Sequence, residues 1–292
     1  LSGMGLAVFF GTFISAWICG TGASLTELIS AMGNMENKPG ICANLILNSI
    51  NQILAFGAAG LAFTILHGSA PGIGFSSKGK NINLNKFLIG AVIITLGFSP
   101  FLDLTYRLNE WLLVDGSTIH TMAAALEAEA MRITMAMLKM ETSKQFFATL
   151  FAIAVLPAVC EEWLFRGAIQ PIFAKWSGNI HIGIWVSAFL FSAIHFQFFG
   201  FLPRLLLGAG FGYMVVASGS LWPAVLGHFV NNGVAVFSAW WLGTEWLAEG
   251  MNPSEGSLGL AEAITSAIGA AAIIGSVWWL KGKTKVLEVR SQ

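Results

Sequence analysis

Long apolar stretches alternate with short polar ones along most of this chain. A bilayer core of about 30 Å requires about 20 mostly apolar residues in each helix that crosses it. The pattern therefore predicts about eight transmembrane helices, at 4–23, 41–66, 86–106, 145–172, 180–199, 201–217, 219–241 and 258–280. Very short turns connect the fifth, sixth and seventh of these, so we expect those three to be adjacent antiparallel neighbours.

A long segment of mixed charge, 107–144, separates the third predicted helix from the fourth. Within it, 118–140 places Met122, Leu126 and Ile133 at helical spacing among charged residues, which predicts an amphipathic helix. Such a helix can lie at the membrane interface or pack against its own bundle, and both remain open. The predicted fold is thus an all-α membrane protein, a polytopic bundle with an amphipathic interfacial helix.

The composition supports a membrane protein. Of the 292 residues, 55% are hydrophobic and 10% are charged, whereas soluble domains carry roughly 25% charged residues. We therefore expect a single integral membrane domain over 1–292. A net charge of zero gives no sign of a nucleic-acid partner. The three cysteines, Cys19, Cys42 and Cys160, lie in apolar runs, and an odd, dispersed set argues against a disulfide framework.

The basic residues predict an orientation for the bundle. One side holds Lys78, Lys80, Lys86, Lys175, Lys281, Lys283, Lys285 and Arg290. The short loops of the other side hold little beyond Lys38 and Arg204, although 107–144 adds further basic residues there. The positive-inside rule then places both termini in the cytoplasm. The first apolar run has no basic region before it and no clear cleavage site, which favours a membrane helix over a signal peptide.

The stretch CEEWLFRG, 160–167, places ionisable groups inside the fourth predicted helix. Such groups are costly at membrane depth and usually functional. Arg166 follows Glu162 by four residues, so the two share a helix face and can pair. Glu161 lies about 100° around the helix and is left for other chemistry. Pro157 lacks an amide proton and is expected to kink the helix.

Two further predicted helices carry polar groups at a similar depth. FSAIH ends at His195, and HFVNN begins at His228 and ends at Asn232, with the last two on one helix face. At about 1.5 Å per residue, all three lie near the level of Glu161. A carboxylate can act as general base toward water, an imidazole can shuttle the proton, and an imidazole with an amide can stabilise an oxyanion. The glycines Gly208 and Gly212 form a GxxxG pattern that would let these helices converge.

Structural roles compete with these functional ones. A lone intramembrane His or Asn often serves only to hold helices together, and Glu162 with Arg166 can be a purely structural ion pair. The same explanation is preferred for a polar stripe on the second predicted helix, formed by Asn44, Asn48, Asn51 and Gln52. Cys160 has apolar neighbours and no nearby histidine in sequence, so we expect an inert thiol.

Three short motifs, taken together and in their order along the chain, favour the functional interpretation over the structural one. EEWLFR at 161–166, FSAIH at 191–195 and HFVNN at 228–232 match the patterns EExxxR, FxxxH and HxxxN. In this order on successive membrane helices they resemble the CPBP family of intramembrane proteases, which includes CAAX prenyl proteases and bacteriocin-processing or immunity proteins. The resemblance covers about 145–240, which would be the catalytic core, and its surroundings look like those of bacterial members.

The resemblance implies a glutamic intramembrane endopeptidase that works without a catalytic metal or other cofactor, in a bacterial inner membrane. Carried over onto this chain, Glu161 and His195 activate water, and His228 and Asn232 stabilise the oxyanion. Glu162 and Arg166 support the site. The implied partners are membrane lipid and a protein or peptide substrate, which can be lipidated.

Two alternatives remain open. Glu161, His195 and His228 could instead form a two-His, one-carboxylate metal site of a membrane hydrolase. The protein could also be a non-enzymatic binding or immunity protein, because intramembrane Glu, His and Arg serve proton relays as well.

Overall fold

The computed structural model describes residues 2–21, 24–34, 36–66, 84–112 and 117–245, together with a few residues between 264 and 271. Every regular element in these ranges is a helix, which confirms the all-α prediction. The predicted helix 258–280 lies almost wholly outside the described residues, as do Lys78, Lys80 and the basic C-terminal residues.

Two long helices, each built from several parts, dominate the bundle. The first comprises α3 (Lys38–Asn51), the π-helical segment η1 (Gln52–Gly57) and α4 (Ala58–Leu66). The second comprises α7 (Ser143–Thr149), the π-helical η2 (Leu150–Val155), α8 (Leu156–Leu164), the π-helical η3 (Phe165–Ile169) and α9 (Gln170–Ser177). The shorter elements are α1 (Ser2–Cys19), α2 (Leu25–Gly33), α5 (Leu84–Trp111), α6 (Thr118–Met137), α10 (Ile180–Ala193), α11 (Phe201–Ser218) and α12 (Trp222–Leu242).

Local sequence signals fix where these helices begin and end. Asn37 caps α3, and its side chain accepts a hydrogen bond from the amide of Gly40. Thr142 and Gln145 form a capping box at the start of α7. Gly178 follows α9 with a φ of 67°, a left-handed conformation that glycine adopts without steric cost, and this turns the chain into α10.

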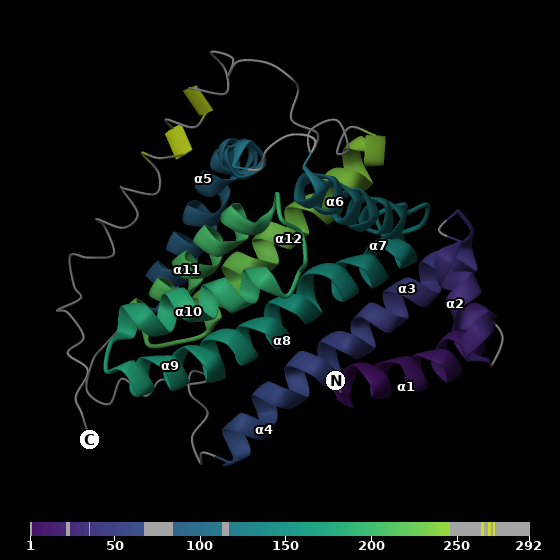
Figure 1. The fold of residues 1–292 in the computed structure, drawn as a ribbon, viewed down its shortest axis with the longest axis horizontal. Coiled ribbons are helices and arrows are strands. Elements are labelled where there is room, and N and C mark those ends of the chain that lie inside the picture. Colours follow the sequence, from purple (N-terminus) through teal and green to yellow (C-terminus); the bar gives the residue numbers. More distant parts are fainter. Residues whose placement is uncertain are drawn as a thin grey trace.

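The long helices lie side by side and position the rest of the bundle (Figure 1). α1 packs against α3, while α12 packs against α8, η2 and α5. α10 lies against α9 and α11, and α11 also contacts α5. The predicted adjacency of the fifth, sixth and seventh helices is therefore found for α10 with α11 and α11 with α12.

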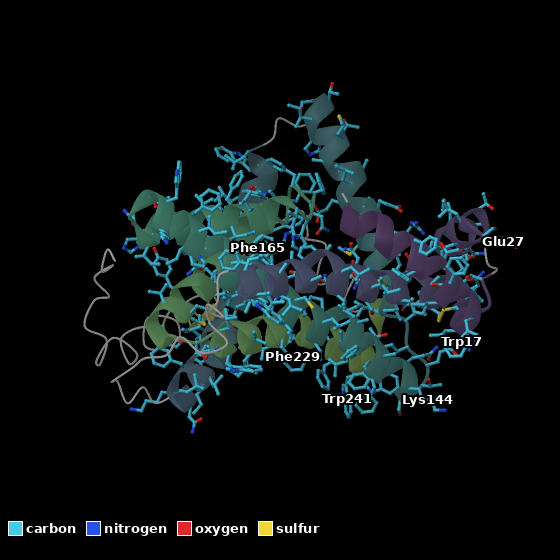
Figure 2. All side chains as sticks on the ribbon, turned by 90° about the horizontal axis from the view of Figure 1, so that it is seen from below. Trp17, Glu27, Lys144, Phe165, Phe229 and Trp241 are labelled. Atoms are coloured by element: carbon cyan, nitrogen blue, oxygen red, sulfur yellow. A yellow bond between two sulfur atoms is a disulfide. The ribbon has the colours of Figure 1, made fainter. Side chains whose placement is uncertain are left out.

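The distribution of side chains is that of a membrane protein. Trp17 is 86% exposed and Trp241 is 85% exposed, and both lie at the edge of the molecule (Figure 2). Polar and charged groups lie inside instead, among them Glu161, Glu162 and Arg166. A soluble protein has the opposite arrangement, with charged groups outside and large apolar side chains inside. The outer surface of this bundle therefore suits hydrocarbon.

Three helices are long and apolar enough to cross a membrane: Lys38–Leu66, Ser143–Ser177 and Phe201–Ser218. Shorter apolar helices cover Phe9–Cys19, Leu84–Phe98 and Ile180–Ala193. These apolar helices are those of an all-α membrane protein, although the described residues do not establish eight spans.

The expectation that the cysteines form no disulfide is wrong. Cys19 ends α1 and Cys42 lies near the start of α3, and the two form a disulfide with a Cα–Cα distance of 5.8 Å. The antiparallel packing of α1 on α3 brings their ends together, which spacing along the chain does not reveal. Cys160 is free and buried, as the inert-thiol interpretation requires.

The predicted helix 180–199 is also too long. α10 ends at Ala193, and Phe196 adopts a φ of 52°, the left-handed region that a bulky residue enters only at a cost. His195 consequently lies on a turn just beyond the helix rather than within it.

Candidate active site

The two adjacent glutamates lie at the centre of the second long helix. α8 carries both, between the π-helical segments η2 and η3. Their exposed fractions are 4% for Glu161 and 0% for Glu162. π-helical segments are rare and recur at functional sites because they re-aim side chains within a helix. The neighbouring glutamates accordingly point to different partners.

Glu162 holds a buried charge cluster together. Arg166 Nη1 donates to Glu162 Oε1 at 2.8 Å, which confirms the predicted ion pair. His228 Nδ1 lies 2.8 Å from the same oxygen. Because the carboxylate accepts, Nδ1 carries the proton, and the Nε2 atom of His228 is left facing the other glutamate.

Glu161 lies between two helices that are distant in sequence. Gln52, the first residue of η1, donates from Nε2 to Glu161 Oε1 at 2.7 Å. His228 Nε2 lies 3.9 Å from Glu161 Oε2. The two carboxylate oxygens thus have distinct environments, one bound by an amide and one facing an imidazole.

The GxxxG pattern in α11 provides the second side of the cluster. Arg166 Nη2 donates to the Gly208 carbonyl at 2.8 Å, and Gln170 Nε2 donates to the Gly212 carbonyl at 3.3 Å. A Cβ atom at Gly208 would come within 2.9 Å of Arg166 Nη2. The predicted close approach is therefore present, and it lets a backbone carbonyl bind a buried guanidinium.

Aromatic rings cover the remaining faces of the charged groups. The guanidinium of Arg166 lies 4.6 Å from the centroid of the Phe191 ring. Phe211 stacks on His228 with an interplanar angle of 17° and ring centroids 5.9 Å apart. Phe191 also contacts the imidazoles of His228 and His195, at centroid distances of 5.8 and 5.3 Å. One phenylalanine therefore links the two histidines.

His195 is oriented by its own turn. Its Nδ1 atom lies 2.8 Å from the Phe191 carbonyl oxygen, so Nδ1 is the donor in this contact. In a neutral imidazole the opposite nitrogen, Nε2, then carries a lone pair and can accept a proton. A residue that helps to activate water needs such an acceptor nitrogen.

Pro157 has no amide proton to donate to the preceding turn of the helix. Side chains from other helices donate to carbonyls of that turn, at Ala152 and Ile153, five and four residues earlier. Asn48 Nδ2 donates to the Ala152 oxygen at 3.1 Å, and Asn232 Nδ2 donates to the Ile153 oxygen at 3.0 Å. Asn232 therefore supports the helix with one N–H, and an amide has a second N–H for other acceptors.

The segment after α10 also forms a contact with the amphipathic helix α6. Gln197 Nε2 donates to Glu127 Oε1 at 3.3 Å, and Arg204 Nη2 donates to the Gln197 carbonyl at 2.7 Å. Burial raises the pKa of Glu127 by more than the nearby Arg204 lowers it. α6 thus lies against the turn that carries His195.

A largely apolar cavity of about 430 Å³ opens beside this turn. It is lined by Ile119, Met122, Ala123, Leu126, Ser192, Ala193, Phe196, Gln197, Phe198 and Phe201. These residues come from α6, from the end of α10, from the turn around His195 and from the start of α11. Within the described part of the chain, no three His, Cys, Asp or Glu side chains are grouped closely enough to hold a metal ion.

Comparison with known proteins shows that the segment carrying this site is similar to one protein family. Residues 143–234 match the model of a family described as type II CAAX prenyl endopeptidase Rce1-like. This segment is similar to an Rce1-like domain. The matched segment holds all six predicted site residues, namely Glu161, Glu162, Arg166, His195, His228 and Asn232. It does not include Gln52.

The chain is also similar to a curated bacterial protein. It is 28% identical over 96 residues to an uncharacterized protein, YpbD, of Bacillus subtilis (strain 168). The similarity covers 32% of this chain and 46% of that protein, so it spans about half of the relative's length. No solved structure matches.

Sequence reasoning assigned Gln52 to the structural polar stripe and so missed its contact with the candidate base. Asn44 does hold helices together, since its amide donates to the carbonyls of Met32 and Gly40. Asn48 acts similarly on Ala152. Gln52 follows Asn48 by four residues on the same face, and this spacing was the available signal that it also reaches the second long helix.

Proposed function

We propose that this protein is an intramembrane glutamic endopeptidase that hydrolyses peptide bonds of membrane-associated or lipidated protein or peptide substrates. The observation that carries the proposal is the buried arrangement of Glu161 beside the Nε2 atom of His228, 3.9 Å from its carboxylate. The Rce1-like match of 143–234 supports a peptidase.

In this proposal Glu161 and His195 activate the attacking water. Glu161 Oε2 is the oxygen not bound by Gln52 and accepts the proton as general base. His195 offers Nε2 as a second acceptor because its Nδ1 proton is bound by the Phe191 carbonyl. The water oxygen attacks the scissile carbonyl carbon, and the proton later passes to the leaving amine.

His228 and Asn232 stabilise the oxyanion that this attack creates. His228 can donate from Nε2 when it is an imidazolium, and the Glu162 carboxylate at Nδ1 stabilises that cation. Arg166 keeps Glu162 oriented and its negative charge compensated. Asn232 would contribute the N–H that is not bound to Ile153.

The surroundings suit a substrate that reaches the site from the membrane. The cavity beside the His195 turn is lined mainly by apolar side chains and can accept an apolar side chain or a lipid group of the substrate. We propose a catalytic core at about 145–240 within one membrane domain, in a bacterial inner membrane with both termini in the cytoplasm.

The decisive test compares purified wild type with the Glu161→Gln variant in liposomes. Both are incubated with a library of lipidated and unmodified peptides, with and without a chelator, and mass spectrometry identifies the products. We expect cleavage by wild type alone, unaffected by the chelator. Glu162→Ala is not a suitable control, because it would leave the buried Arg166 without its partner.

Three other results of this experiment would contradict the proposed function. Cleavage that the chelator abolishes and added metal restores would assign the chemistry to a metal hydrolase that uses Glu161, His195 and His228. Equal cleavage by wild type and Glu161→Gln would reject Glu161 as the base. Absence of cleavage across the library would favour a non-enzymatic binding or immunity protein.

A further inference from the structure

We infer that Gln52 is a positioning residue of the catalytic site, contributed by a helix outside the Rce1-like segment. The inference rests on the proposed role of Glu161 as general base. Gln52 is the first residue of the π-helical segment η1, and its side chain is 7% exposed. It crosses from the first long helix to the second and binds the carboxylate itself.

The contact selects one oxygen of the carboxylate. Gln52 Nε2 occupies Glu161 Oε1 at 2.7 Å, whereas Oε2 lies on the side of His228 Nε2. A carboxylate held in this way cannot rotate freely about its last side-chain bond. The oxygen that accepts the proton is therefore fixed before the substrate arrives, which is how preorganisation lowers a reaction barrier.

The rest of the Gln52 side chain argues against a purely structural amide. Its Oε1 atom is buried and has no hydrogen-bond partner among the described residues. Burying an unpaired acceptor destabilises a fold, so packing alone would favour an apolar side chain of the same size. Asn44, on the same helix, shows the structural alternative, because its amide donates to the backbone carbonyls of Met32 and Gly40.

The backbone around Gln52 also supports a positioning role, because it brings η1 close to α8. η1 packs against α8, and Gly57 at its other end lies against Cys160, where an added Cβ would come within 3.1 Å of the sulfur. A wider helical turn at η1 thus brings the first long helix close to the residue just before Glu161. Three π-helical segments, η1, η2 and η3, lie around this one carboxylate.

The test uses the full-length protein with a matched control on the same helix. Gln52→Met keeps the side-chain volume but removes the amide. Asn44→Leu removes a structural amide two turns earlier. With the best-cleaved peptide of the library, we expect Gln52→Met to lower kcat by 10-fold to 100-fold with KM unchanged and thermal stability retained. Asn44→Leu should lower thermal stability and leave kcat unchanged.

A double variant separates positioning from an independent effect. If Gln52 acts through Glu161, Gln52→Met should cause no further loss of any trace rate that a long incubation detects for Glu161→Gln, since residues that act as a unit are not additive. A kcat for Gln52→Met within twofold of wild type, with Glu161→Gln inactive, would overturn this inference and leave the proposed function intact. Full activity of Glu161→Gln would overturn both.

An infrared measurement tests the contact without any substrate. The carboxyl band of Glu161 is identified by its absence from the Glu161→Gln spectrum. Loss of the hydrogen bond at Oε1 should move this band in Gln52→Met and leave it in place in Asn44→Leu. An unmoved band in Gln52→Met would show that the amide does not bind the carboxylate, and the inference would fail.

Discussion

At the scale of single residues, two identical neighbouring side chains have different hydrogen-bond partners and therefore different environments. Glu162 is bound by a guanidinium and an imidazole on one oxygen. Glu161 is bound by a neutral amide and faces the far side of the same imidazole. Glu162 is thus a fixed structural charge, whereas Glu161 has an oxygen available for chemistry.

This difference predicts different changes in stability from the same substitution at the two glutamates. Glu162→Gln should lower stability by about 3 kcal/mol, because Arg166 would keep a buried positive charge without a compensating carboxylate. Glu161→Gln should change stability little, since no cation depends on it at hydrogen-bond distance. Unfolding midpoints of the two variants in detergent test this, and equal stabilities would contradict it.

The residue scale also shows what a single sequence can and cannot reveal. The pair of Glu162 with Arg166 was predictable because a helix places i and i+4 together. The ordered motifs identified His195, His228 and Asn232 as candidates. The contact of Gln52 with Glu161 joins positions that are 109 residues apart, and no local pattern encodes such a distance.

At the scale of helices, the apolar pattern located the main spans to within a few residues. It predicted 145–172 and 201–217, and the structure has Ser143–Ser177 and Phe201–Ser218. It did not predict the π-helical segments, because one extra residue in a turn hardly changes the apolar periodicity. It also extended the helix at 180–199 past Ala193, since four of the next six residues, IHFQFF, are still apolar.

The close approach of α11 to the second long helix depends on Gly208 more than on Gly210. Gly208→Ala should lower stability by about 1–3 kcal/mol, because the new methyl group would collide with Arg166 and Phe191. Gly210→Ala is the matched control, since nothing lies within 4 Å of its added carbon. Thermal unfolding of both variants measures the difference, and equal loss from both would contradict the packing described here.

At the scale of the whole molecule, the N-terminal helices contribute side chains that contact the candidate site. The Rce1-like match begins at residue 143, yet α3 and η1 supply Asn48 and Gln52 to the second long helix. The disulfide then joins α1 to α3. We therefore expect the 143–234 segment to be an incomplete catalytic unit when it is separated from the helices that precede it.

The disulfide and the proposed orientation of the protein can be tested together. Cys19 and Cys42 lie at the end of the bundle where Lys38 pairs with Glu141 at 2.7 Å. The positive-inside rule places this end outside the cytoplasm, and disulfides persist in such oxidising compartments. A membrane-impermeant reductant added to intact cells should thus expose both thiols to a maleimide mass tag.

Cys42→Ser provides the control, because it leaves Cys19 free before any reduction. It should also destabilise the protein, by about 3 kcal/mol for a loop of this length if the chain unfolds freely. If wild type labels at Cys19 and Cys42 only after the membrane is made permeable, this end faces the cytoplasm. The orientation of the entire bundle would then be the reverse of the one proposed here.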